Sequence, residues 1–355
     1  MKDALKNLKQ LTSLDGISGD ETAVRDHIIS LIKDYVDDYY VDNMGNLITY
    51  KKGNGDGPKV MLDAHMDEVG LMVSHINSDG LLKFQTIGGI EARVLVGKRV
   101  RIGENRVPGV IGLKPIHLQS ARERSGAVDK KSLTIDIGAK DREQAESMVE
   151  IGDRVAFEYD PVEFGDNKLM AKALDDRVGC AALIELLKDD YEFDIYGCFT
   201  VQEEVGLKGA KTASFQVIPD IALVLEGTTC YDVPDTKEHS MSTVCGKGPA
   251  LTFMDRSVIA DRELVAHIAS VAEKNGIPYQ YKKTVSGGTN AGRIQVNGTG
   301  VKVAVIAAPC RYIHTPVSVI DISDFENMIE LAKKVLETIP VSINLYREQG
   351  GKTNV

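Results

Sequence analysis

The chain has 355 residues, of which 43% are hydrophobic and 26% charged, a composition typical of a soluble globular protein with room for more than one domain. Its formal charge of −10 argues against a general nucleic-acid binder, which would present a basic face to phosphates. No apolar run reaches about 18 residues, and the first residues mix Lys and Asp with apolar ones. We therefore expect neither a membrane span nor a signal peptide, and predict a cytoplasmic protein.

The first predicted element is an amphipathic helix within residues 18–36. Ser18 and Glu21 have the spacing of a capping box, in which a hydroxyl and a carboxylate satisfy the first backbone amides of a helix. Strand-like runs then follow at residues 39–42, 46–52 and 59–64.

Residues 70–165 have a different sequence pattern, with short Val- and Ile-rich runs separated by glycine and one brief helical pattern at 141–150. This pattern predicts a small β-rich, barrel-like domain inserted into a larger one. The predicted boundaries are 1–69 and 166–355 for the larger domain and 70–165 for the insert.

The rest of the chain alternates helical and strand patterns, which predicts a layered α/β domain. The helical patterns are at 177–190, 261–276 and 323–339, and the strand patterns are at 194–201, 221–226 and 301–308.

Acidic and histidine residues recur where these apolar runs end. The carboxyl ends of strands in an open α/β sheet lie at one edge, so groups far apart in sequence can meet there. The residues are His65 and Asp67, Glu203 and Glu204, Glu226, and His314, with Asp175 and Asp176 just before a helix.

Carboxylates gathered in one pocket would repel one another, and divalent cations would remove that conflict. Nitrogen and oxygen ligands suit zinc, cobalt or manganese, and a shared carboxylate can hold two cations roughly 3.5–4 Å apart. Taken singly, a histidine after a strand is more often structural, and paired acids are usually solvated or at a helix start. Their recurrence at boundaries of apolar runs favours the metal site.

The same segments match a known family. They are AHMDEVG (64–70), KALDDRVG (172–179), VQEEVGLKGA (201–210), ALVLEGTT (222–229), GGTNAG (287–292) and RYIHTPVSVID (311–321). In order and spacing they resemble the metallopeptidase family 42 aminopeptidases, which use two metal ions and include glutamyl, leucyl and deblocking aminopeptidases. The resemblance implies a zinc-exopeptidase type of α/β fold and removal of amino-terminal residues from peptides.

The resemblance also implies a role for each residue. His65 and Glu226 would be terminal ligands of one metal, Glu204 and His314 of the other, and Asp175 the bridging carboxylate. The metals would be zinc or cobalt, with manganese a further option. Glu203 would be the general base and Asp67 would orient the imidazole of the first histidine. The Asp175–Asp176 peptide bond would be cis.

Related enzymes use the inserted domain for dimer contacts and assemble six dimers into a hollow tetrahedral particle. By analogy we predict a homo-oligomer, a dodecamer, with a dimer as the alternative. His117 or Gln119 of the insert could reach a neighbour's active site, although a structural role for His117 is favoured.

Substrate preference is left open between apolar and acidic residues. Many relatives have an aspartate where this chain has Asn290, and Arg293 follows. If this loop lines the side-chain pocket, the change in charge would disfavour Lys and Arg substrates. Alternatively, Asn290 keeps a turn hydrogen bond and Arg293 faces solvent.

Two other classes compete with the aminopeptidase. A glycoside hydrolase would use two carboxyl groups without metal, but it needs aromatic platforms, and the chain has no Trp. A catalytically inactive metal-binding assembly protein could keep the fold, although a spare carboxylate at Glu203 argues against it.

Overall fold

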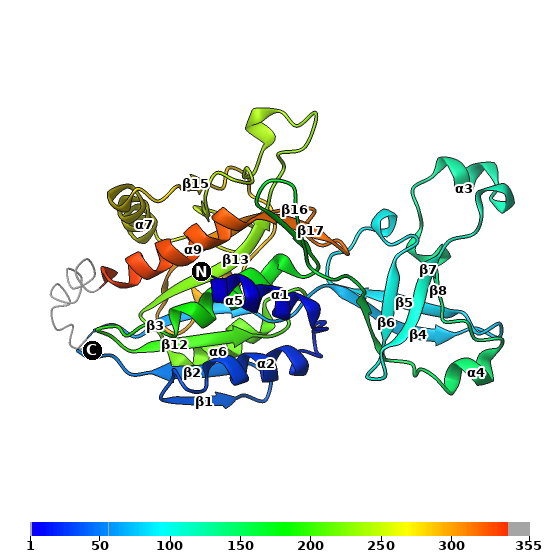
Figure 1. Ribbon diagram of the computed structural model, residues 1–355, viewed down its shortest axis with the longest axis horizontal. Coiled ribbons are helices and arrows are strands. Elements are labelled where there is room, and N and C mark those ends of the chain that lie inside the picture. The colour runs from blue at the N-terminus through cyan, green and yellow to red at the C-terminus, as the bar shows by residue number, and fades with distance from the viewer. Residues whose placement is uncertain (1, 56, 340–355) are drawn as a thin grey trace.

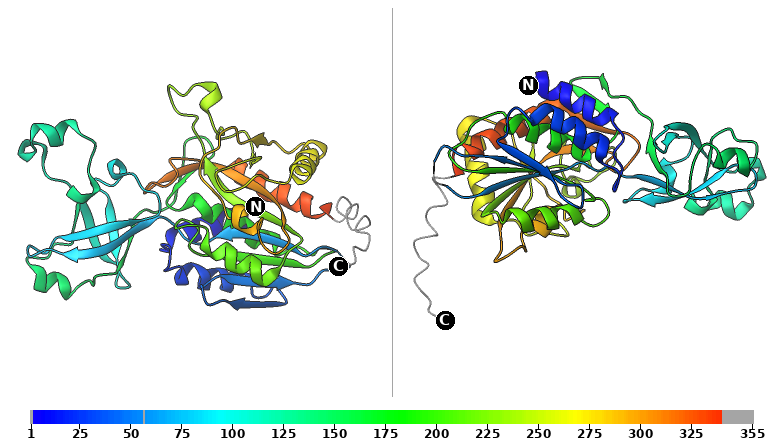
Figure 2. Two further views of the ribbon diagram at one scale, coloured as in Figure 1. Left: turned by 180° about the vertical axis from the view of Figure 1, so that it is seen from behind. Right: turned by 90° about the horizontal axis from the view of Figure 1, so that it is seen from below.

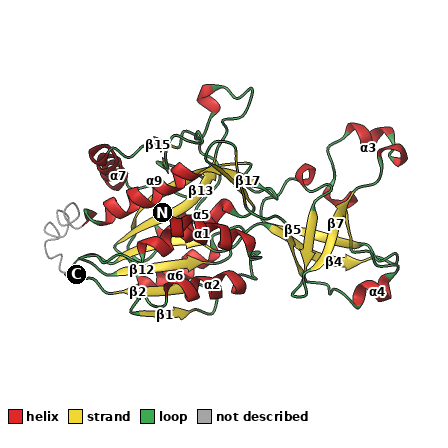
Figure 3. Ribbon diagram, in the orientation of Figure 1, coloured by secondary structure: helices red, strands yellow, loops and turns green. Residues whose placement is uncertain are grey.

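The computed structural model describes residues 2–55 and 57–339, and its two β-sheets lie side by side (Figure 1). The larger sheet carries helices on both faces, and the smaller one closes into a barrel. Figure 3 shows the same division by secondary structure, with most helices gathered around the larger sheet. The predicted layered α/β fold with a β-barrel insert is confirmed.

The larger sheet has eleven strands within the described residues. At its centre β12, β3, β13 and β16 run parallel, which brings their carboxyl ends to one edge. The main order is β1 (Asp38–Val41), β2 (Leu47–Lys51), β12 (Ile195–Thr200), β3 (Val60–His65), β13 (Ile221–Thr229), β16 (Lys302–Arg311), β17 (Ser318–Asp321), β11 (Lys168–Ala171) and β10 (Val162–Phe164), with β14 (Ala250–Leu251) and β15 (Gln280–Tyr281) beside β16.

Helices cover both faces of this sheet (Figure 2). Apolar side chains of the central strands, such as Leu62 and Leu223, pack with the first group of helices, while Met61 and Val224 pack on the opposite face. The first group is α1 (Lys2–Ser13), α2 (Thr22–Ile32), α5 (Leu174–Leu186), α7 (Arg262–Asn275) and α9 (Ile322–Leu336), and the second is α6 (Lys208–Val217) and α8 (Ala291–Ile294).

The barrel has its own apolar interior, to which Leu71, Val100 and Ile135 belong. Its strands close in the order β4 (Gly70–Ile76), β5 (Leu82–Ile87), β8 (Thr134–Asp136), β7 (Val107–Gly112), β6 (Arg99–Ile102) and β9 (Arg154–Phe157). Short helical segments on its connections are α3 (Ala121–Ser125), α4 (Arg142–Glu146), η1 (Ala92–Val94), η2 (Ile116–Leu118) and η3 (Lys130–Ser132), whereas η4 (Glu238–Ser240) lies outside it. Because β10 already pairs with β11 in the larger sheet, the chain leaves the barrel a few residues before the predicted boundary at 165.

The amino-terminal region differs from the prediction in two ways. Helix α1 precedes the first predicted helix and buries Leu8 and Leu11 against the core. The capping box is wrong, because the Ser18 hydroxyl donates to Asp67 and the Glu21 carboxylate accepts from Gly19 N–H and Gln202 N–H. Both side chains serve tertiary contacts instead.

No helix of the described residues is long and apolar enough to cross a membrane.

Candidate metal centre

The carboxyl edge of the central strands brings the sequence-selected residues together. His65 is the last residue of β3, Glu226 lies in β13, and Glu204 and His314 follow β12 and β16. With Asp175 from the start of α5, they form two groups that could hold metal ions, and Asp175 belongs to both.

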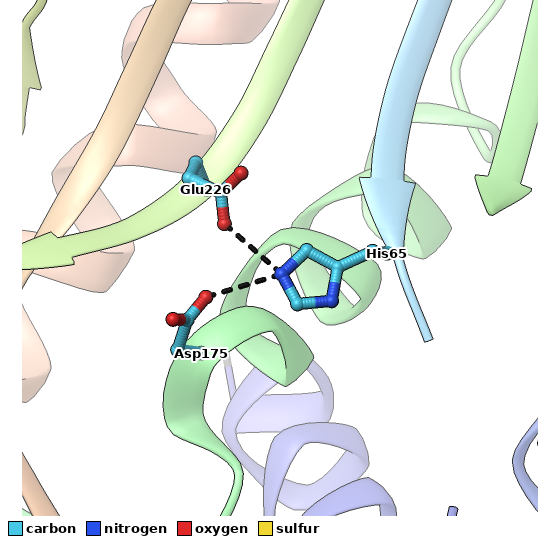
Figure 4. A group of neighbouring side chains, drawn as sticks. All are labelled: His65, Asp175 and Glu226. Carbon is cyan, nitrogen blue, oxygen red and sulfur yellow. Dashed lines mark hydrogen bonds and ion pairs between the residues drawn. The ribbon is translucent and has the colours of Figure 1, made fainter. Parts of the chain in front are cut away.

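The first group is His65, Asp175 and Glu226 (Figure 4). The Nε2 atom of His65 lies 3.2 Å from Asp175 Oδ1 and 3.3 Å from Glu226 Oε1. The His65 side chain is buried, and the two carboxylates point to the same ring nitrogen from different elements. One imidazole nitrogen and two carboxylate oxygens therefore face a common point.

The second group uses the other oxygen of the same aspartate. The Nε2 atom of His314 lies 3.3 Å from Asp175 Oδ2 and 3.3 Å from Glu204 Oε2. His314 sits in the loop after β16 with a left-handed φ of 59°, which is uncommon for a residue with a side chain. The two oxygens of Asp175 thus face two separate histidines.

Asp67 fixes the ring of His65. The Nδ1 atom of His65 lies 3.0 Å from the backbone oxygen of Asp67 and 3.4 Å from its Oδ1. Both of these atoms are acceptors, so the proton belongs on Nδ1 and Nε2 keeps its lone pair for a metal. The buried carboxylate of Asp67 also accepts from the hydroxyl of Ser18 at 2.6 Å.

Asp176 is buried beside the candidate site, where its carboxylate accepts two backbone N–H groups. Its Oδ2 accepts from the backbone N–H of His65 at 3.1 Å, and its Oδ1 accepts from that of Gly179 at 2.9 Å. The Asp175–Asp176 peptide bond is cis, as the resemblance implied. The side chain of Asp176 is buried in the core, whereas that of Asp175 contacts the two histidines.

Crowding of acids dominates the electrostatics. Burial raises the pKa of Glu204 to about 7 and that of Glu226 to about 8, and it also raises the pKa of Glu203. Burial would raise the pKa of Asp175 as well, but the hydrogen bonds of His314 and His65 hold it below the ordinary range. The local arrangement disfavours so many negative charges without cations.

The donor set fits divalent metal ions. It offers two imidazole nitrogens and three carboxylates, which suit zinc, cobalt or manganese. The Oε2 atom of Glu226 is buried and has no hydrogen-bond partner, a costly arrangement that a cation would relieve.

A buried charged network next to the site was missed by the sequence analysis. The Oε1 atom of Glu68 lies 2.5 Å from Lys172 Nζ and 3.4 Å from the guanidinium of Arg177, and all three side chains are buried. Asp15 joins Lys172 to Arg101 of the barrel. The sequence does contain a sign of this network, because the basic residues Lys172 and Arg177 flank the acidic pair in KALDDRVG.

The structure corrects the proposed specificity loop. Asn290 is buried, and its Nδ2 donates to Asp63 at 2.8 Å and to Thr200 at 2.9 Å, so this side chain braces two strands and does not line a side-chain pocket. Arg293 is exposed, as the alternative held. His117 is also exposed, in η2, and any role toward a neighbouring subunit stays a prediction.

Comparison with known proteins identifies the family of this chain. The sequence profile described as M42 glutamyl aminopeptidase matches residues 45–331, which is most of the chain. The chain belongs to the M42 aminopeptidase family. The lysyl aminopeptidase of Pyrococcus furiosus is 36% identical over 342 residues, covering 94% of this chain and 96% of that protein.

Solved structures agree with this assignment. Aminopeptidase APDkam598 from Desulfurococcus kamchatkensis has a TM-score of 0.90 at 39% identity, covering 95% of each chain. The TET1 peptidase of Pyrococcus horikoshii has a TM-score of 0.83 at 36% identity, covering 94% of this chain and 99% of that one. The predicted aminopeptidase is confirmed at the level of the family, and the glycoside hydrolase alternative is not favoured.

Proposed function

We propose that this M42 family member is a dinuclear-metal aminopeptidase in which Asp175 bridges the two ions. The observation that carries the proposal is the pair of contacts from one carboxylate, with Oδ1 toward His65 and Oδ2 toward His314. Glu226 completes the ligands of the first ion and Glu204 those of the second. Zinc or cobalt suits these ligands best, and manganese is a third option.

Two divalent ions, when bound, would polarise the substrate carbonyl and lower the pKa of water between them. The remaining steps fall to residues of the chain. Glu203 is a nearly buried carboxylate beside the ligand Glu204, and it would take a proton from water and later hand it to the leaving amine. Asp67 would keep His65 in the tautomer that presents Nε2.

We also propose that the chain forms a homo-oligomer through the inserted barrel. The TET1 peptidase of Pyrococcus horikoshii, similar over 94% of this chain, can assemble into a tetrahedron or a large octahedral shell. This likeness supports a large homo-oligomer. We propose a dodecamer, which sedimentation or mass photometry would distinguish from the dimer alternative.

Hydrolysis of aminoacyl p-nitroanilides by chelator-stripped protein tests the activity. We expect release of nitroaniline only after zinc or cobalt is added, and none from N-acetylated versions of the same substrates, which lack a free amine. Calorimetry should find two metal ions per chain. The proposal would be contradicted if no substrate of the panel were hydrolysed with any of the metals, or if chelator left the turnover unchanged.

A further inference from the structure

The histidines of the two groups of potential metal ligands are held in different ways. The Nδ1 atom of His65 lies 3.0 Å from the backbone oxygen of Asp67, and the His65 side chain is only 1% exposed. The side chain of His314 is 38% exposed, and within residues 2–55 and 57–339 its Nδ1 atom has no hydrogen-bond partner. The orientation of the second imidazole therefore depends more on the groups packed against it.

The inserted barrel supplies a group that packs against His314. Gly88 and Gly89 directly follow β5, and a Cβ atom at Gly89 would lie 3.4 Å from Nδ1 of His314 and 4.0 Å from its Cε1. A Cβ atom at Gly88 would lie 3.4 Å from the Cβ of Glu204. One pair of barrel glycines therefore lies beside both ligands that belong to the second group alone.

The two glycines are needed for different reasons. Gly88 has a left-handed φ of 79°, and a Cβ atom there would lie only 2.7 Å from Val69, so the turn itself requires glycine. Gly89 is exposed and is not among the residues with a left-handed φ. The backbone at Gly89 would therefore accept a side chain, and the group that this side chain would meet is the imidazole of His314.

A second residue of the barrel borders the same group of ligands. Phe157 belongs to β9 and to the apolar interior of the barrel, and its side chain is buried. It lines a small cavity together with all three members of the second group. Within the described part of the chain, neither His65 nor Glu226 lines this cavity, so this approach of the barrel concerns the second group.

Ion pairs hold the barrel against the larger domain. The Oδ1 atom of Asp15, in the loop after α1, accepts from Nη2 of Arg101 at 2.7 Å, and its Oδ2 lies 3.0 Å from Nη1 of Arg106. Both arginines belong to the barrel, in β6 and just before β7. Two charged contacts to one carboxylate limit how far the barrel can move away, which keeps the glycine pair beside the metal centre.

We propose that Gly89 is a positioning residue of the metal centre, through which the inserted barrel supports His314 and strengthens binding of the second ion. The inference rests on the proposed dinuclear centre. Without a side chain, the backbone at Gly89 lies close to the imidazole and leaves Nδ1 open to solvent. When Nε2 faces a metal ion, the proton of the neutral ring is on Nδ1 and needs an acceptor.

A larger residue at position 89 would cover Nδ1 and press on the ring, and overpacking of this kind shifts side chains from their places. It should therefore weaken the second ion and leave the first ion, held by His65 and Glu226, in place. On this view the inserted domain serves catalysis as well as assembly.

Calorimetry of chelator-stripped protein with zinc tests this role. The wild type should bind two ions, and Gly89→Val should lower the affinity for one of them about 10- to 100-fold while the other stays within about threefold. Gly89→Ala should cause a smaller loss in the same direction, about 3- to 10-fold, and decides the question if the valine variant does not fold. Nitroaniline release should fall with the occupancy of the second ion and recover when the zinc concentration is raised.

The matched control is Gly112→Val in β7. This barrel glycine also lacks a left-handed φ, and the nearest atom to a Cβ there is the backbone oxygen of Thr134, at the ordinary distance of 3.9 Å. Both zinc affinities should stay unchanged in this variant.

A double-mutant cycle distinguishes positioning of His314 from a general loosening of the fold. In His314→Ala the ring is absent, so adding Gly89→Val should cause no further loss of zinc affinity. In Glu226→Ala, which impairs the first group, adding Gly89→Val should still weaken the second ion. Unchanged affinities in Gly89→Val, or an equal loss for both ions, would overturn the role of Gly89 and leave the dinuclear centre standing. A wild type that binds fewer than two ions would overturn both proposals.

Discussion

The carboxylate of Asp67 holds the backbone of Glu203, 136 positions further along the chain, by accepting its N–H at 2.9 Å. The other carboxylate oxygen accepts the N–H of Glu204 at 3.2 Å and the hydroxyl of Ser18. Since Asp67 also contacts the ring of His65, one buried carboxylate positions groups of both halves of the metal centre. We propose that Asp67 orients these groups, because it is in neither group of potential ligands.

Replacing Asp67 with Asn should weaken metal binding. Asparagine keeps one oxygen acceptor, but its amide nitrogen cannot accept the N–H that the other carboxylate oxygen now accepts. The backbone of Glu203 or of Glu204 would therefore lose its fixed position beside the candidate metal centre. We expect zinc affinity to fall roughly 10- to 100-fold, as measured by competition with a chelating dye. The control is Asp160→Asn, an exposed aspartate outside the site. Unchanged zinc affinity in Asp67→Asn would contradict this positioning role.

Replacing Glu203 with Gln should separate catalysis from metal binding. The amide keeps the size of the side chain but cannot take a proton from water, so kcat should fall by about 10²- to 10⁴-fold. Metal content, measured by mass spectrometry, should stay at the wild-type level because Glu203 is in neither ligand group. Glu330→Gln changes an exposed glutamate of α9 and should leave both quantities unchanged. Full activity in Glu203→Gln would show that another group acts as the base.

The convergence at the metal centre was predictable because parallel strands end at one edge. Long apolar runs identify β3, β12, β13 and β16, and polar residues directly after or within such runs have few other reasons to occur there. The same reasoning led to His65, Glu204, Glu226 and His314, which the structure brings together.

The supporting contacts could not be predicted from local pattern. Ser18 matches a capping box, but the tertiary fold places its hydroxyl 2.6 Å from Asp67, and that contact prevails over the local motif. Asn290 is buried against Asp63 because of how distant strands pack, which no short sequence window records. The apolar residues of α1 do have amphipathic spacing. That this face is buried follows from the packing of α1 against α5 in the folded structure.

Replacing Glu68 with Gln should destabilise the fold. The carboxylate is the close anionic partner of two buried cations, Lys172 and Arg177. Without it, Lys172 would keep the more distant carboxylate of Asp15, 3.7 Å away, and Arg177 would lose the carboxylate that it contacts. Removing one partner of a buried ion pair typically costs about 3–5 kcal/mol, so the midpoint of urea unfolding should fall clearly. Glu163→Gln breaks the exposed pair with Lys9 and should change stability by less than about 1 kcal/mol. Equal midpoints for the two variants would refute the importance of the buried network.

Replacing Glu21 with Gln should change how stability depends on pH. Burial raises the pKa of Glu21 from 4.5 to about 7, although hydrogen bonds from Gly19 and Gln202 oppose the increase. The folded state therefore binds a proton more tightly than the unfolded state, and this group's contribution to the free energy of unfolding falls as pH rises from about 4.5 to about 7.

A glutamine at position 21 cannot ionise, so the variant should lack this decline. The difference between variant and wild type should grow in favour of the variant across the same pH range, by up to roughly 3 kcal/mol, and level off above it. Urea unfolding of both proteins at a series of pH values measures this difference directly, because contributions from all other titrating groups cancel. A constant difference from pH 4.5 to 8 would mean that Glu21 ionises alike in both states, and a difference that grows in favour of the wild type would mean that its pKa is lowered by the two N–H donors.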